Sequence, residues 1–136
     1  MKEQPAEQTA QVNWRKQREA QGTRTITIGV QKVAEEPVDA DFEQAAVYTI
    51  DVPAQKGLLQ INYRGDVARL YANGQLIDDN FYNGRPFQYA LWRLPEEVKQ
   101  LELRILPLQK DMPVYFPREA DVSKPGEQVN NICVIF

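Results

Sequence analysis

Four side chains of the types that recognise sugars lie within eleven positions of one another, namely Tyr82, Asn83, Arg85 and Trp92. Aromatic rings can stack on the apolar face of a pyranose, while the planar groups of Asn and Arg can hydrogen-bond pairs of its hydroxyls. Three of the four fall in the segment 78–86, which is rich in turn-forming residues. We therefore predict a loop there and take it as the leading carbohydrate-site candidate. The alternative is that these side chains pack within the protein or against a neighbouring domain.

The same segment begins with Asp78, Asp79 and Asn80, whose oxygens are of the kind that bind calcium. A structural calcium ion is the weaker possibility here, and no other cofactor is expected. Hydrolysis of a glycoside would instead need two carboxylates about 5 to 9.5 Å apart. The acidic pairs 78–79 and 96–97 are adjacent in sequence, and neighbouring side chains on a strand or turn diverge. We expect both pairs to be solvated surface groups.

Composition removes most catalytic arrangements. The chain of 136 residues contains no histidine, so it lacks the commonest general base, the commonest metal ligand and every Ser-His-Asp triad. Its single cysteine, Cys133, can form neither an internal disulfide nor a cysteine-rich zinc site. Cys133 lies in the apolar run 132–136, so we expect a buried structural thiol, with a nucleophile as the alternative. The sequence thus predicts a chain that is not an enzyme by itself.

Length and composition fit one globular domain. Hydrophobic residues make up 43% of the 136 positions, which is enough for a single core. The net charge is −3 and the basic residues are scattered among acids, so we expect no nucleic-acid partner, because phosphate binding relies on clustered Lys and Arg. No apolar run approaches the roughly 20 residues of a membrane span, so we expect none.

A hairpin is the strongest local signal. The strand pattern of residues 67–72 runs into Asn73 and Gly74, the pair favoured in a two-residue type I′ turn because both central residues need positive φ. Asp66 at the strand entrance can accept hydrogen bonds from turn amides and lock the hairpin, with ligand contact as the alternative. Gly84, after Tyr82 and Asn83, is expected to close a second turn.

Period-two alternation of apolar residues recurs along the chain, with no sustained helical pattern. A single helical turn is expected at 95–99. The predicted strands are 25–30, 46–52, 59–63, 67–72, 87–91, 101–105, 114–116 and 132–136. Short strands at this spacing predict an all-β fold, an antiparallel two-sheet β-sandwich of jelly-roll type.

The first 22 residues read differently from the rest. Gln, Glu, Lys and Ala dominate, and Val12 and Trp14 are the only large apolar side chains there after Met1. Such a segment has little to bury, so we expect residues 1–22 to be a linker or poorly ordered arm and residues 23–136 to form the sandwich. Trp14 either docks the arm onto the sandwich or belongs against a neighbouring domain.

Three quoted segments carry a family resemblance: DVARLYANG at 66–74, DNFYNGRPF at 79–87 and LELRILPL at 101–108. Together they resemble the C-terminal jelly-roll region of glycoside hydrolase family 35 β-galactosidases of gut Bacteroidetes, and more broadly the galactose-binding-like sandwiches attached to many glycosidases. The resemblance covers roughly residues 44–118. The hairpin followed about nine residues later by Tyr-Asn-Gly is its most specific part.

The resemblance implies a non-catalytic accessory domain of a carbohydrate-active enzyme. In that family the catalytic acid and nucleophile are two glutamates of a TIM barrel, so neither carries over to this chain. The implied partners are the catalytic barrel and a galactoside or other glycan, and the implied location is the periplasm or cell surface. The alternatives are a stand-alone carbohydrate-binding module, a structural protein-protein interaction domain and a self-sufficient hydrolase.

Overall fold

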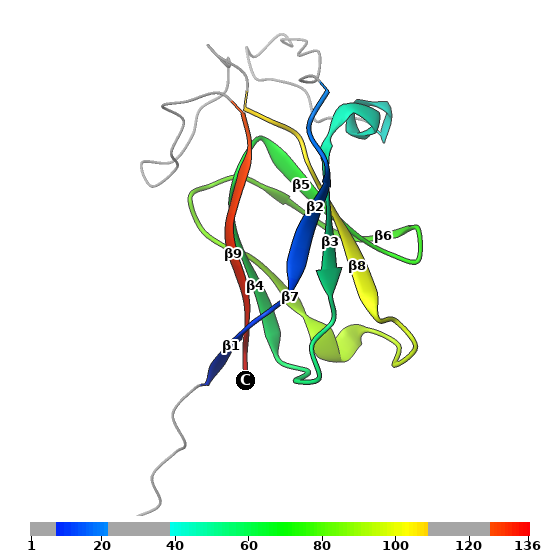
Figure 1. Cartoon of the computed structure of the whole chain (residues 1–136), viewed down its shortest axis with the longest axis vertical. Coiled ribbons are helices and arrows are strands. Elements are labelled where there is room, and N and C mark those ends of the chain that lie inside the picture. The colour runs from blue at the N-terminus through cyan, green and yellow to red at the C-terminus, as the bar shows by residue number, and fades with distance from the viewer. Residues whose placement is uncertain (1–7, 22–38, 109–125) are drawn as a thin grey trace, which may run out of the picture.

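The computed structural model describes residues 8–21, 39–108 and 126–136. Within them, nine strands form two antiparallel sheets (Figure 1). The four-stranded sheet has the order β1 (Thr9–Gln11), β9 (Gln128–Ile135), β4 (Leu58–Arg64) and β7 (Phe87–Ala90). The five-stranded sheet has the order β2 (Trp14–Arg18), β3 (Ala46–Asp51), β8 (Gln100–Ile105), β5 (Val67–Ala72) and β6 (Gln75–Phe81).

This strand order is that of a jelly roll. The row β1-β9-β4-β7 faces the row β3-β8-β5-β6, and β2 extends the second row by one edge strand. The chain therefore passes repeatedly from one sheet to the other, as two interlocked Greek keys require. The predicted all-β, two-sheet sandwich is confirmed. Two short 3-10 helices, η1 (Asp39–Gln44) and η2 (Leu91–Arg93), complete the described elements, and neither is long or apolar enough to cross a membrane.

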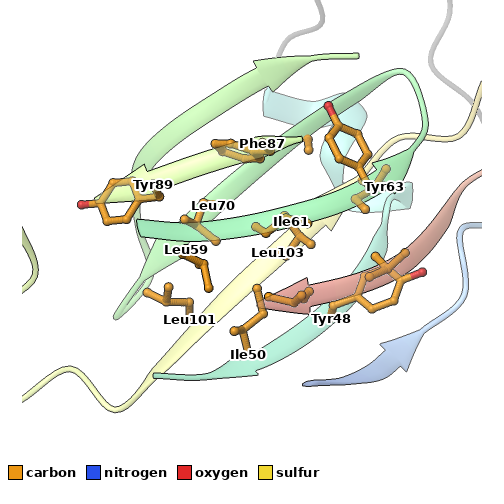
Figure 2. Close-up of a cluster of buried hydrophobic side chains, with 14 of the residues drawn as sticks. Tyr48, Ile50, Leu59, Ile61, Tyr63, Leu70, Phe87, Tyr89, Leu101 and Leu103 are labelled. Carbon is orange, nitrogen blue, oxygen red and sulfur yellow. The ribbon is translucent and has the colours of Figure 1, made fainter. Parts of the chain in front are cut away.

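The core lies between the two sheets (Figure 2). Alternate residues of each central strand point inward, because successive side chains of a strand face opposite sides. Both sheets contribute buried side chains: Tyr48, Ile50, Leu70, Leu101 and Leu103 from the five-stranded sheet, and Leu59, Ile61, Tyr63, Phe87 and Tyr89 from the four-stranded sheet. Ala46, Ala68 and Ala72 sit on the same inner face and leave room for these larger groups.

The N-terminal segment differs from its prediction. Part of residues 1–22, expected to lie outside the sandwich, supplies β1, which pairs with β9, and β2, which pairs with β3 (Figure 1). Between them Val12 is buried and its amide donates to the Ile132 carbonyl at 3.0 Å. Trp14 packs on Tyr48 with ring centroids 5.7 Å apart. Two short edge strands need only these apolar anchors, because their outer faces stay in solvent.

Other differences concern boundaries. Residues Asp78 to Phe81, expected in a loop, belong to β6 because they pair with β5. The last strand begins at Gln128, four residues before its predicted start. At 95–99 the Val98 amide donates to the Pro95 carbonyl at 3.1 Å, which closes a turn there. The predicted strands 25–30 and 114–116 lie outside the described residues.

Candidate functional site

Tyr82 closes one end of the core. Tyr82 is buried, and its ring meets the Tyr63 ring edge-on with centroids 5.6 Å apart. The Tyr82 amide donates to the Asp66 carbonyl at 3.0 Å. The Tyr63 hydroxyl in turn donates to the Asn80 carbonyl at 3.1 Å. Burial is the main cause that raises the pKa of this Tyr63 hydroxyl. A ring held this way is not offered to a sugar.

Asn83 and Gly84 build the turn that follows. The Asn83 side-chain oxygen accepts from the Arg85 amide at 2.9 Å, and Gly84 has φ of 83°, in the left-handed region. The planar group of Asn83 therefore holds the local backbone. Arg85 itself is exposed.

Trp92 lies at the other end of the sheet. It belongs to η2, is 64% exposed, and follows Leu91, whose amide donates to the Gly57 carbonyl at 3.0 Å. Gly57 precedes the first residue of β4, whereas Tyr63 lies near its last, so the two ends are roughly 20 Å apart at the usual rise of a strand. The structure does not bring Trp92 together with Tyr82, Asn83 and Arg85.

Asp66 and the hairpin turn also occupy opposite ends of one strand, β5. Asp66 is only 4% exposed, and its amide donates to the Leu106 carbonyl at 2.7 Å. Asn73 and Gly74 have φ of 50° and 80°, and Ala72 pairs with Gln75, as the predicted two-residue turn requires. The Asp66 backbone thus joins the start of β5 to Leu106, directly after β8, and to Tyr82, directly after β6.

Two of the three calcium candidates, Asp78 and Asn80, make other side-chain contacts. Asp78 accepts from the Asp79 amide at 2.9 Å, and the Asn80 amide group donates to the Tyr63 hydroxyl at 2.7 Å. The three residues are consecutive in a strand, so their side chains alternate between its two faces. No group of three or more His, Cys, Asp or Glu side chains in the described residues could hold a metal ion.

A polar hollow that the sequence analysis missed lies on the outer face of the five-stranded sheet. We call it the outer hollow. It measures about 500 Å³ and opens between η1, β8 and the β5–β6 hairpin, around Arg69, Tyr71, Glu102 and Arg104. These four side chains alternate with core residues along β5 and β8, and that outward period-two pattern was the available signal. A second hollow of about 440 Å³ continues it and shares Tyr71, Glu102 and Arg104.

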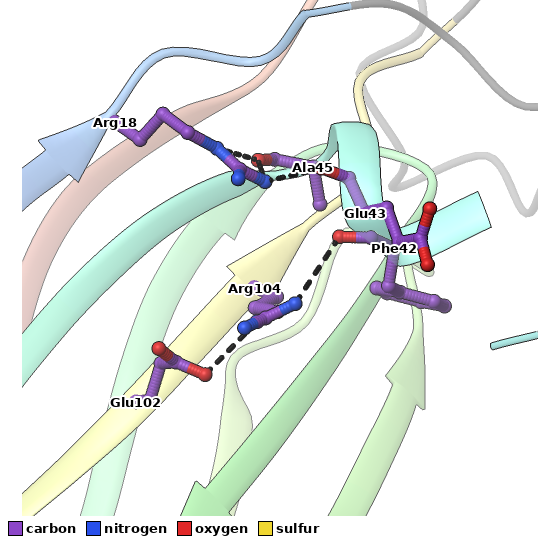
Figure 3. A network of polar contacts seen from close by, with 6 residues as sticks. All are labelled: Arg18, Phe42, Glu43, Ala45, Glu102 and Arg104. Carbon is purple, nitrogen blue, oxygen red and sulfur yellow. Dashed lines mark hydrogen bonds and ion pairs between the residues drawn. The ribbon is translucent and has the colours of Figure 1, made fainter. Parts of the chain in front are cut away.

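The helix η1 forms one wall of the outer hollow and is pinned in place. Phe42 and Ala45 pack on Val67 and Leu106 in a small second core. Arg18 of β2 donates to the carbonyl oxygens of Glu43 and Ala45 at 2.7 and 2.8 Å (Figure 3). These hydrogen bonds join β2 to the end of η1, which covers part of the outer face of the sheet.

Arg104 holds the same helix from below. It donates to the Phe42 carbonyl at 3.5 Å and to the Glu102 carboxylate at 2.9 Å (Figure 3). Its guanidinium carbon also lies 5.4 Å from the centroid of the Tyr71 ring. Ring, guanidinium and carboxylate therefore sit side by side on the floor of the outer hollow.

Arg69 is the least expected residue of the outer hollow. It is 8% exposed, its guanidinium carbon lies 4.2 Å from the Phe42 ring centroid, and it pairs with Asp39 at 2.5 Å. Burial lowers the pKa of Arg69, but hydrogen bonds to Asp39 and Tyr71 more than offset this, so the pKa lies above its ordinary value. Arg69 Nε is buried with no hydrogen-bond partner among the described residues.

A separate polar cluster joins the two ends of the chain. Glu127, whose side chain is 4% exposed, accepts from Lys16 Nζ and from the Tyr48 hydroxyl, each at 2.5 Å. Lys16 belongs to β2 and Tyr48 to β3, while Glu127 directly precedes β9. The cluster therefore holds edge strand, core strand and C-terminal strand together.

Cys133 is buried in β9, as predicted.

Comparison with known proteins finds no relative: no family model matches the chain, and neither a curated protein nor a solved structure matches it. The class is defined by the fold alone, an antiparallel β-sandwich with jelly-roll strand order.

Proposed function

We propose that this chain is a non-catalytic accessory β-sandwich of a β-galactosidase-type glycoside hydrolase, where it supports the catalytic barrel. One observation carries the proposal: the residues on which the family resemblance rests build the scaffold. Asn73 and Gly74 make the hairpin, Tyr82 closes the core and Asp66 is buried where three strands meet. Motif residues that build the sandwich, rather than a reactive site, fit a supporting domain.

One end of the sandwich offers a surface for such a partner. Trp92 is the most exposed of the large apolar side chains in the described residues, and Phe136 is also exposed. Both flank Gly57: its carbonyl accepts from Leu91, and a Cβ built on it would lie 2.9 Å from the Cβ of Phe136. Aromatic side chains at one end of a domain are typical of interface anchors. We assign this end to the barrel.

Binding to a barrel tests the proposal. The chain is mixed with a family 35 β-galactosidase barrel expressed without its own C-terminal sandwich, and sedimentation velocity measures complex formation. We expect a one-to-one complex that Trp92→Ala weakens at least roughly tenfold, since exposed aromatic anchors dominate interface energies. Phe81→Ala, which removes an aromatic ring that is 50% exposed on β6, is the control and is expected to have no effect. Absence of a complex, or equal effects of both variants, contradicts the proposal.

A carbohydrate-binding role is the second candidate. It is favoured by the outer hollow, which combines an aromatic ring with planar charged groups, rather than by the loop that the sequence indicated. The family resemblance would place the parent enzyme in the periplasm or at the cell surface.

A further inference from the structure

The floor of the outer hollow carries a pair of residues that the sandwich itself does not favour. Arg69 of β5 and Arg104 of β8 are direct partners in the antiparallel register. Like charges placed directly opposite each other on one face destabilise a sheet. Asp39 and Glu102 each neutralise one of them, so the arrangement needs two added carboxylates merely to be tolerated.

Arg69 has a second unfavourable feature besides its position opposite Arg104. Burying a guanidinium is costly unless its donors are used, yet its Nε is buried without a hydrogen-bond partner among the described residues. Phe42 covers one face of the group and Tyr71 lies on the same strand face two residues along. A side chain held this rigidly beneath a helix is preorganised, which is what a binding site requires.

Size and charge narrow the ligand class. At about 500 Å³ the outer hollow is within the range of small-molecule sites, and the adjoining hollow of about 440 Å³ gives room for more than one ring. Three carboxylates line the outer hollow, those of Asp39, Glu43 and Glu102, against the two guanidiniums. The excess of acids disfavours phosphate, sulfate and uronic acids. Asp39 and Glu102 are already paired with the two guanidiniums, so a neutral ligand suits the remaining polar groups best.

The polar groups then define what an uncharged ligand must offer. Glu102 accepts, Arg104 donates, and the two lie 2.9 Å apart beside the Tyr71 ring. A vicinal pair of hydroxyls can donate to the carboxylate and accept from the guanidinium while the C–H face of the same ring lies on Tyr71. We propose that the outer hollow is a binding site for a neutral saccharide of one or two units. This inference rests on the proposed function, because it names the glycan contact of that module.

Nuclear magnetic resonance titration of the full chain tests the site. The probes are galactose and β-1,4-galactobiose, with galacturonate as the charged comparison, all at millimolar concentration. We expect saturable shifts at Tyr71, Glu102 and Arg104 with the neutral sugars and weaker ones with galacturonate. Tyr71→Ala is expected to weaken binding roughly tenfold, and Glu102→Gln, at a partly exposed position, by a smaller factor. Tyr71→Phe keeps the ring and is expected to retain binding, which separates loss of stacking from loss of folding.

Trp92→Ala is the matched control, because it removes an exposed aromatic ring at the other candidate position. Binding unchanged by Trp92→Ala and weakened by Tyr71→Ala supports the site. No saturable shift with either neutral sugar, tighter binding of galacturonate, or loss of binding in Trp92→Ala alone overturns it. The proposed function is tested separately, by complex formation with the barrel. Sugar binding without a complex would refute the supporting role and leave the site intact.

Discussion

At the scale of single residues, buried polar groups decide how the protein responds to pH. Burial raises the pKa of the Tyr48 hydroxyl, and its hydrogen bond to Glu127 acts in the same direction. Burial also raises the pKa of Tyr63. For Lys16 burial lowers the pKa, but hydrogen bonds to Glu127 and Glu19 outweigh it, so the pKa is raised. All three groups hold their protons more tightly in the folded chain.

These shifts predict alkaline destabilisation. The folded chain keeps protons that the unfolded chain releases near pH 10, so the free energy of unfolding falls as pH rises above that value. Below it the contribution is fully present. Denaturant unfolding measured from neutral to strongly alkaline pH is expected to show a plateau and then a decline, and Tyr48→Phe is expected to reduce the slope. A free energy of unfolding that stays level throughout that range contradicts the assignment.

Residue patterns predicted the hairpin and the inward faces, but they did not show which polar side chains gather around the outer hollow. Period two fixes which side chains share a face, and Leu70 and Leu103 lie where it put them. It cannot tell whether an outward Arg69 is solvated or roofed, because the roof comes from η1, 25 or more residues earlier in the chain. Likewise, the residue type of Tyr82 does not show whether its ring stacks on a sugar or packs in the core.

At the scale of elements, the contribution of the edge strand β2 to the stability of the sandwich can be measured. Trp14 of β2 packs on Tyr48, whereas Trp92 of η2 is largely in solvent. We expect Trp14→Ala to lower the free energy of unfolding by about 2 kcal/mol, since full burial of a Trp is worth about 3–5 kcal/mol. The identical change Trp92→Ala is expected to cost well under about 1 kcal/mol. Equilibrium urea unfolding measures both, and similar losses for the two variants would show that β2 is not part of the folded unit.

The edge strands also show where element prediction stops. Strands β3, β5 and β8 are central, and inward apolar residues recur at every second position of each, so their existence could be predicted from the sequence. Strand β2 buries little, and its pairing is set by partners far along the chain, such as Glu127 for Lys16. A three- or five-residue strand held by distant contacts leaves too short a local pattern to recognise.

At the scale of the whole molecule, the described residues build a scaffold, and we propose that a separate catalytic domain supplies the chemistry. Two meshed sheets place their apolar residues between them, and the polar clusters around Glu127 and Arg104 tie distant strands together. The acidic pairs weighed for catalysis are dispersed: Asp78 and Asp79 alternate along a strand, and Glu96 and Glu97 are exposed. This arrangement agrees with our proposal that the chain is a scaffold and that a partner domain supplies the chemistry.

The most direct test of this division is hydrolysis of an aryl β-galactoside by the purified 136-residue chain. We predict release of the aryl group no faster than in buffer, at any chain concentration, while the same preparation forms a complex with the family 35 barrel. Turnover that rises in proportion to the chain and is lost in Glu96→Gln or Asp79→Asn would contradict it.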